Sequence, residues 1–161
     1  MILRRPPQKK LRVTLGKPEV TRTEKTQELH SKGYNCAQAV ACAYCDLVGV
    51  SEDEIFRMTE GYGLGMGCME GICGAVSGAA ALAGMKNSLG CENPISKKAT
   101  YQLSGEILKR FREKNGSVIC RELKGVDTGK VLRSCSGCIR DAAELAEEIL
   151  FSDAENPPEK P

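Results

Sequence analysis

The chain has 161 residues, of which 41% are hydrophobic and 27% charged, a balance that indicates one folded domain and argues against a disordered chain. With three Phe, four Tyr and no Trp, aliphatic and small side chains must fill the core, which favours packed helices over a β-sandwich. The net charge is only +2, and a single histidine leaves little acid–base machinery, which argues against a hydrolase.

The positive charge lies in an N-terminal arm, residues 1–18, which holds six Arg and Lys and no acid. The remaining 17 basic residues face 21 acidic ones, so the rest of the chain is mildly acidic. We expect the arm to be a solvated, disordered tail, because no aromatic residue interleaves with its charges as RNA recognition would favour. The sequence therefore gives no clear indication of nucleic-acid binding.

No apolar stretch has the length of a secretory signal or of a membrane span. The longest small-and-apolar run, residues 72–85, is interrupted by several Gly and Ser. The expected compartment is therefore the cytoplasm, where disulfides are rare and many cysteines indicate metal binding or redox chemistry. The count of nine cysteines agrees with this, because nine thiols cannot all pair within one chain.

Helical periodicity, capping residues and glycine stops predict an all-α domain over residues 19–151, a compact multi-helix bundle followed by a loose tail, 152–161. A polar helix is expected over 19–31, and capping boxes at Asn35 and Ser51 begin helices that end near 49 and 59. A glycine-rich loop, 61–71, then precedes a small-residue helix over 72–85. We expect this helix to be the buried centre of the bundle.

Three further helices complete the expected fold. The first begins at Asn93-Pro94, with inward positions at Ile95, Leu103, Ile107, Leu108 and Phe111. The second is a short helix that Ser117 caps and Gly125 ends. The third starts at Ser134 or Ser136 and runs to about Ile149.

Four cysteines lie at or near the start of a predicted helix: Cys36, Cys73, Cys120 and Cys138. First turns offer unpaired N–H groups and the positive end of the helix dipole, which stabilise a thiolate. Four such thiolates are suitable ligands for an iron–sulfur cluster. Gly71 and Gly74, on either side of Cys73, would let the backbone approach bound sulfide without a side-chain clash. For each cysteine alone, the alternative is a small buried side chain.

The other cysteines have different settings. Cys135-Ser-Gly-Cys138 is a C-x-x-C pair at a helix start, the arrangement of dithiol oxidoreductases, although the β-α-β pattern of a thioredoxin is absent. Cys42-Ala-Tyr-Cys45 has the same spacing inside a helix, where we expect two half-buried small residues. Cys68, in the glycine loop, would be a replacement ligand or a resolving thiol. Cys91 lies in a predicted loop and has no assigned role.

Other metal and cofactor sites are less well supported. A zinc site built from both C-x-x-C pairs is disfavoured, because about ninety residues separate them, far more than the usual spacing. Neither pair is followed by His, which excludes haem attached through thioethers. His30 lies on a polar helix and is expected to face solvent. The glycine run matches neither G-x-G-x-x-G nor the P-loop pattern.

The cysteine-bearing segments resemble the C_GCAxxG_C_C family, which is named for four cysteines and a glycine-rich motif around the second. The family's cysteine domain is also similar to one in the split-Soret cytochromes. The resemblance covers about residues 22–151, and its landmarks are 35–40 (NCAQAV), 63–79 (GLGMGCMEGICGAVSGA), 116–125 (GSVICRELKG) and 138–143 (CIRDAA). This chain departs from those cytochromes in having no haem motif, so any electron transfer would run through the cysteine site alone.

The resemblance implies a small helical redox protein whose functional set is Cys36, Cys73, Cys120 and Cys138. Three functions stay open. The first is electron transfer or redox sensing through an iron–sulfur cluster, with a redox partner protein. The second is a thiol–disulfide oxidoreductase that uses Cys135 and Cys138, with Cys73 as a nucleophile. The third is a non-catalytic module that binds zinc or copper. A homodimer is compatible with the small-residue helix faces.

Overall fold

The computed structural model describes residues 19–152, so the predicted arm and all of the predicted tail except Ser152 lie outside the described residues. Within this part the chain is all-α, as predicted, and its one β-bridge joins Ile72 to Ile119. The helices and turns, in chain order, are α1 (Arg22–Ser31), α2 (Cys36–Cys42), α3 (Cys45–Val48), α4 (Glu52–Thr59), η1 (Glu60–Tyr62), α5 (Gly63–Met66), α6 (Gly74–Asn87), η2 (Pro94–Ser96), α7 (Lys97–Asn115), α8 (Cys120–Leu123), α9 (Cys135–Ala146) and η3 (Glu147–Phe151).

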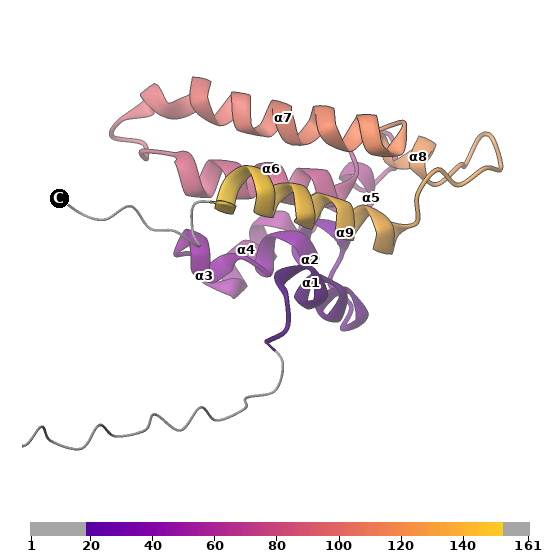
Figure 1. Cartoon of the computed structure of the whole chain (residues 1–161), viewed down its shortest axis with the longest axis horizontal. Helices are drawn as coiled ribbons and strands as arrows, with labels where there is room; N and C mark the ends of the chain where they lie inside the picture. The colour runs from indigo at the N-terminus through magenta and orange to yellow at the C-terminus, as the bar shows by residue number, and fades with distance from the viewer. Residues whose placement is uncertain (1–18, 153–161) are drawn as a thin grey trace, which may run out of the picture.

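Helix α6 is the centre of the bundle, with α7 along one side, α9 beside it and the group α1–α4 on the other side (Figure 1). Its small residues allow neighbouring backbones to come close. A Cβ atom at Gly78 would lie 2.6 Å from the carbonyl oxygen of Ala37 in α2, so only glycine fits there without a shift. The predicted small-residue central helix is therefore confirmed, although it begins at Gly74 rather than Ile72.

The predicted helix over 35–49 is interrupted, and a buried tyrosine explains the break. Tyr44 leaves the helical conformation between α2 and α3, with φ −116° and ψ 12°. Its ring stacks on Phe151 with 5.1 Å between centroids, and its hydroxyl donates to the Ala143 carbonyl at 3.1 Å. The last helix also changes near this contact, since α9 ends at Ala146 and continues as the π-helical turn η3.

Of the other local predictions, the helix caps are mostly confirmed and one inward position is wrong. The capping boxes at Asn35 and Ser51 are confirmed, and Ser134 rather than Ser136 caps α9. Ile95 was predicted to face inward, but it is 75% exposed because Pro94 begins a 3-10 turn and α7 starts only at Lys97. The remaining inward positions of α7 are buried or half-buried.

Ser117 is also not the cap that the sequence predicted for α8. Ile119 is the N-cap residue, and the Ser117 hydroxyl instead accepts a hydrogen bond from the Ile119 N–H at 3.0 Å. The glycine loop is more regular than expected, because η1 and α5 form short turns within it.

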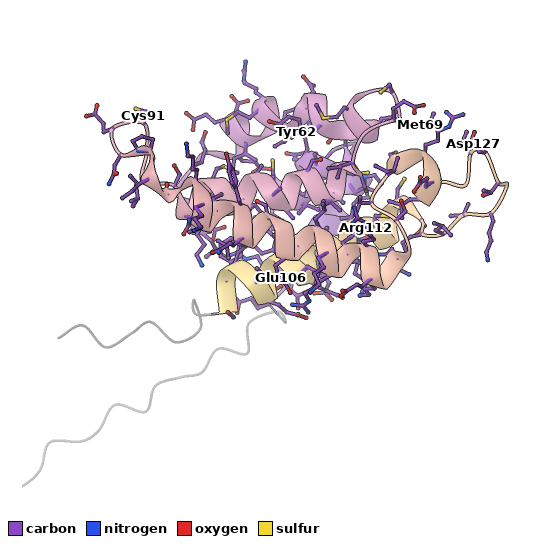
Figure 2. All side chains as sticks on the ribbon, turned by 90° about the horizontal axis from the view of Figure 1, so that it is seen from above. Tyr62, Met69, Cys91, Glu106, Arg112 and Asp127 are labelled. Carbon is purple, nitrogen blue, oxygen red and sulfur yellow. The ribbon has the colours of Figure 1, made fainter. Side chains whose placement is uncertain are left out.

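The two ends of the bundle differ. At one end α5 and α8 lie near the start of α9, and the long α8–α9 connection projects from the bundle (Figure 1). The opposite end carries the α6–α7 connection with Cys91, far from Met69 and Asp127 (Figure 2). Over residues 19–152, no helix has both the length and the hydrophobicity that crossing a bilayer requires.

Candidate cysteine redox site

Five of the nine cysteines line one cavity of about 200 Å³. The fold brings together the four predicted site cysteines and adds a fifth, Cys135. The cavity-lining cysteines are Cys36, Cys73, Cys120, Cys135 and Cys138. Residues far apart in the sequence therefore meet at the end of the bundle where α2, α6, α8 and α9 begin (Figure 1).

Each of these cysteines is positioned by the start of its helix. Cys36 is the first residue of α2, where the Asn35 and Gln38 side chains satisfy each other's backbone N–H groups. Cys73 is the N-cap of α6, and the nearby backbone N–H groups of Ala75 and Val76 help to lower the pKa of its thiol. The helix start thus favours an anionic sulfur at this position.

Helix starts also position Cys120 and the C-x-x-C pair. Cys120 is the first residue of α8, and its N–H donates to the Gly71 carbonyl at 3.0 Å. Cys135 and Cys138 are the first and fourth residues of α9, where the Ser134 hydroxyl accepts from the Gly137 N–H at 3.0 Å. The cap fixes the first turn of α9 and with it the direction of both thiols.

The glycine loop forms a close-packed wall beside Cys120. A Cβ atom at Gly65 would lie 2.5 Å from the Cys120 Cβ, and Gly65 also has a left-handed backbone with φ +55°. Gly74 lines the cavity, in the position that the sequence predicted. Gly71 instead packs on Met66 and supplies the carbonyl that holds Cys120. The glycines bring protein backbone against the cysteines.

Three residues in this loop adopt a left-handed backbone without being glycine. Leu64, Met66 and Met69 have φ 53°, 63° and 64°, and the side chains of Leu64 and Met66 are about half exposed. Such a conformation is costly for these residues, and it persists only where surrounding contacts hold it. Leu64 also lines the cavity, so the strained segment forms part of the cavity mouth.

The thiols of Cys36 and Cys135 form a hydrogen-bonded pair across the starts of α2 and α9. The Cys36 thiol donates to the Cys135 sulfur, and the Lys124 ammonium also donates to it. These donors, Cys36 first, outweigh burial and lower the pKa of Cys135 to about 5. The same hydrogen bond, with burial, raises the pKa of Cys36. Within this pair, negative charge is therefore favoured on Cys135.

Cys73 and Cys138 form a second pair deeper in the site. The Cys138 thiol donates to the Cys73 sulfur, which lowers the pKa of Cys73 and raises that of Cys138. The N–H groups at the start of α6 lower the pKa of Cys73 further, against its burial. Cys120 has no thiol partner of this kind, and burial raises its pKa.

Two cationic side chains and a histidine line the cavity, and the sequence did not predict any of them there. His30 was expected to face solvent, but it is half-buried on the cavity, with Nδ1 2.9 Å from the Tyr34 carbonyl oxygen. Lys124 contacts Cys135, and Arg133 lies over Gly137, where a Cβ atom would clash with the guanidinium. No carboxylate lines the cavity among the residues described, so the rim is basic.

The remaining four cysteines lie outside the cavity. Cys42 was expected to be half-buried, but it is fully buried in α2, with its sulfur 3.7 Å from the Glu52 carbonyl oxygen. Cys45 is half-buried. Cys68 is exposed in the glycine loop, and Cys91 is exposed at the opposite end of the bundle (Figure 2). All cavity cysteines lie in the first turn of a helix or at its cap, but Cys45 opens α3 outside the cavity, so this signal alone does not separate the two groups.

The donor set fits a thiophilic metal group by its chemistry, since thiolates with N–H donors are the ligands of iron–sulfur clusters, zinc and copper(I). The placement of the possible metal ligands is a separate finding. From residue 19 to residue 152, no three His, Cys, Asp or Glu side chains are placed to hold a metal ion. The five thiols line a common cavity.

Comparison with known proteins agrees with this cysteine pattern. Residues 34–149 match the family described as "Putative redox-active protein (C_GCAxxG_C_C)". The chain belongs to this family. The match includes all five cavity cysteines, and it confirms the resemblance that the cysteine segments indicated. No curated protein and no solved structure matches the chain. Membership in the C_GCAxxG_C_C family thus supports redox activity and leaves the cofactor to the chemistry of the site.

Proposed function

We propose that this C_GCAxxG_C_C protein holds an iron–sulfur cluster on Cys36, Cys73, Cys120 and Cys138 and uses it for electron transfer or redox sensing. One observation carries the proposal: cysteines at the starts of four separate helices line a single cavity. Such convergence of thiols and helix N-termini favours a bound anionic group, because each helix start stabilises negative charge.

The size of the cavity favours a cluster over a single ion. A tetrahedral zinc site draws four sulfurs to within about 2.3 Å of one point. The cavity of about 200 Å³ that these cysteines line together with other residues is many times what one water needs. A group with several metal and sulfide atoms suits ligands that are spread around a space.

The chain's own groups would tune the site. A cluster, when bound, supplies one-electron transfer, and hydrogen bonds to its sulfurs and its burial set the potential. The N–H groups of Ala75 and Val76 lie at the helix start next to Cys73 and help to lower its pKa, and Lys124 adds a positive charge to the cavity lining. Both features stabilise the more negative, reduced state. A reducing compartment such as the cytoplasm suits this proposal, because free thiols persist there.

Anaerobic purification followed by visible absorption and by iron and sulfide analysis tests the proposal. We expect a coloured protein whose iron and sulfide fall sharply in the Cys36→Ser and Cys120→Ser variants. Cys91→Ser is the matched control, since Cys91 is exposed at the other end of the bundle. Protein that stays colourless and iron-free after reconstitution, or that takes up only zinc or copper, would refute the cluster.

The thiol pairs support a second candidate, a metal-free thiol–disulfide oxidoreductase. Cys135 and Cys73 are the thiols with lowered pKa values, and each accepts a hydrogen bond from a neighbouring cysteine. A stabilised thiolate beside a second thiol is the arrangement that dithiol exchange requires. Turnover of a disulfide substrate by iron-free protein, lost in Cys135→Ser, would favour this candidate over the first.

A further inference from the structure

The five cavity thiols differ in their access to solvent. Cys73, Cys120 and Cys138 are only 5%, 6% and 2% exposed. Cys36 and Cys135 are half-buried, and so they are the two thiols of the cavity that a molecule in solution reaches first. Both thiols also line the same cavity, and each contributes to the pKa shift of the other.

The helix starts that carry Cys36 and Cys135 are connected through helix α1. Cys135 opens α9, and the next residue, Ser136, exchanges two hydrogen bonds with Gln27 of α1. Helix α1 leads directly into α2, which Cys36 opens. The starts of α2 and α9 are therefore tied together through α1, and the two thiols that they carry line the same cavity.

We propose that Cys36 and Cys135 form a disulfide when the protein meets a low-molecular-weight disulfide, and that this bond withdraws Cys36 from the cluster ligands. The second part rests on the proposed function. The first part does not, because it concerns the metal-free protein alone. The site would then alternate between a form that binds the cofactor and an oxidised form that does not.

The exchange needs only the disulfide R–S–S–R as oxidant. The Cys135 thiolate, next to Lys124, attacks one sulfur and forms a mixed disulfide, and the first RS⁻ leaves. The Cys36 sulfur then attacks the Cys135 sulfur, the mixed disulfide breaks, and the second RS⁻ leaves with the proton of Cys36. Two cysteines are oxidised and one small disulfide is reduced to two thiols.

The competing product is the bond that the C-x-x-C spacing indicates, between Cys135 and Cys138. Cys138 is 2% exposed and its thiol already donates to Cys73. Its sulfur would have to leave that partner before it could reach Cys135. The pairing across two helices is therefore favoured over the pairing within α9.

Disulfide mapping tests the proposal. Metal-free protein is treated with oxidised glutathione, free thiols are blocked at low pH, and disulfide-linked peptides are identified by mass spectrometry. We expect a peptide that joins Cys36 to Cys135, absent in the Cys135→Ser variant and present in Cys68→Ser and Cys91→Ser. A dominant Cys135–Cys138 link, or a stable glutathione adduct on Cys135, would overturn the pairing.

A second measurement addresses the exclusion of the cofactor. Protein loaded with iron is titrated anaerobically with oxidised glutathione, and linked peptide and iron content are followed together. We expect the Cys36–Cys135 link to appear in proportion to the iron lost. Full linkage with iron retained would show that Cys36 is not a ligand. If the protein never binds iron, the proposed function fails, while the mapping in metal-free protein still decides the disulfide.

Discussion

The two C-x-x-C segments have the same spacing and opposite settings. Cys42-Ala-Tyr-Cys45 spans the end of α2 and the start of α3, where burial and then Glu52 raise the pKa of Cys42 to about 12. Cys135-Ser-Gly-Cys138 opens the twelve-residue helix α9 at the cavity, and there the pKa of Cys135 falls to about 5. The motif alone therefore does not determine reactivity. Its position on the helix does.

The two segments are also anchored differently. Behind the α9 pair, the buried carboxylate of Asp141 accepts hydrogen bonds from Arg133 at 3.0 and 3.1 Å and lies 2.8 Å from the Lys114 ammonium. Behind the α2 pair, Asp46 bonds Arg22 at the surface, with 56% of its side chain exposed. The helix that carries Cys135 and Cys138 is thus anchored by a buried ion network, whereas the ion pair next to Cys45 is exposed to solvent.

Replacing the two carboxylates should give the largest difference between the segments. We expect Asp141→Asn to lower the free energy of unfolding by about 3 kcal/mol, because it leaves Arg133 without its carboxylate partner and Lys114 with only the partly exposed Glu144. The matched variant Asp46→Asn should cost less than about 1 kcal/mol, as exposed pairs do. Urea denaturation of both variants gives the comparison.

The pH dependence of the same experiment has a defined sign. Burial alone would raise the pKa of Asp141, but hydrogen bonds from Lys114 and Arg133 outweigh burial and lower it. Its stabilising contribution is therefore present above the unfolded-state pKa and is lost as the pH falls through the lower folded value. Wild-type and Asp141→Asn stabilities should converge in acid. An equal gap at pH 7 and in strong acid would contradict this account.

Alkylation rates should separate the two segments by about a hundredfold. With a pKa of about 12, Cys42 is ~1 part in 10⁵ thiolate at pH 7, but its thiolate is about 10³ times more nucleophilic than that of Cys135. The net advantage of Cys135 is thus about 10², before burial slows Cys42 further. Timed iodoacetamide labelling of metal-free protein with peptide mass spectrometry measures both rates.

The pH profiles provide the internal control for this labelling. The Cys135 rate should be flat from about pH 6 to pH 8 and fall below about pH 5, whereas the Cys42 rate should rise about tenfold per pH unit. Parallel profiles for the two cysteines would show that their settings do not control their reactivity.

The fold could be predicted where the signal is local. The capping boxes at Asn35 and Ser51 and the small-residue pattern of α6 each specify a short segment by themselves. The break at Tyr44 could not be predicted, because it follows from stacking on Phe151, more than a hundred residues away. The exposure of Ile95 likewise depends on where α7 packs, which periodicity alone does not show.

The candidate site also has a part that could be predicted from local sequence and a part that could not. Four cysteines at helix starts could be selected from the sequence, since the first turn of a helix is a local feature. The pairing of Cys36 with Cys135, and the approach of Lys124, depend on how α1, α8 and α9 pack together. His30, on a polar helix, and Arg133, in a loop, belong to no sequence pattern that would place them on a cavity. Their roles became visible only with the structure.

Removing the cation beside Cys135 should give a smaller effect. Lys124→Met raises the pKa of Cys135, because the ammonium that stabilises the thiolate is gone, while the larger contribution of Cys36 remains. We expect alkylation of Cys135 at about pH 5 to slow by up to tenfold, with most of the rate kept in Lys124→Arg. Lys109→Met, on the exposed face of α7, is the control and should label at the wild-type rate. Identical alkylation rates of Cys135 in Lys124→Met and wild type would show that Lys124 does not stabilise the Cys135 thiolate.

The smallest effect should come from the helix caps. Ser134→Ala and Ser51→Ala each remove a side-chain cap, of α9 and of α4, and each should cost about 1 kcal/mol of stability. Only the first cap holds the turn that carries Cys135, so only Ser134→Ala should also slow alkylation of Cys135. Equal loss of stability with unequal loss of reactivity would separate the helix-start effect from general destabilisation. If both variants slowed Cys135 alike, its reactivity would reflect opening of the whole bundle, and the contrast between the two C-x-x-C segments would have to rest on burial alone.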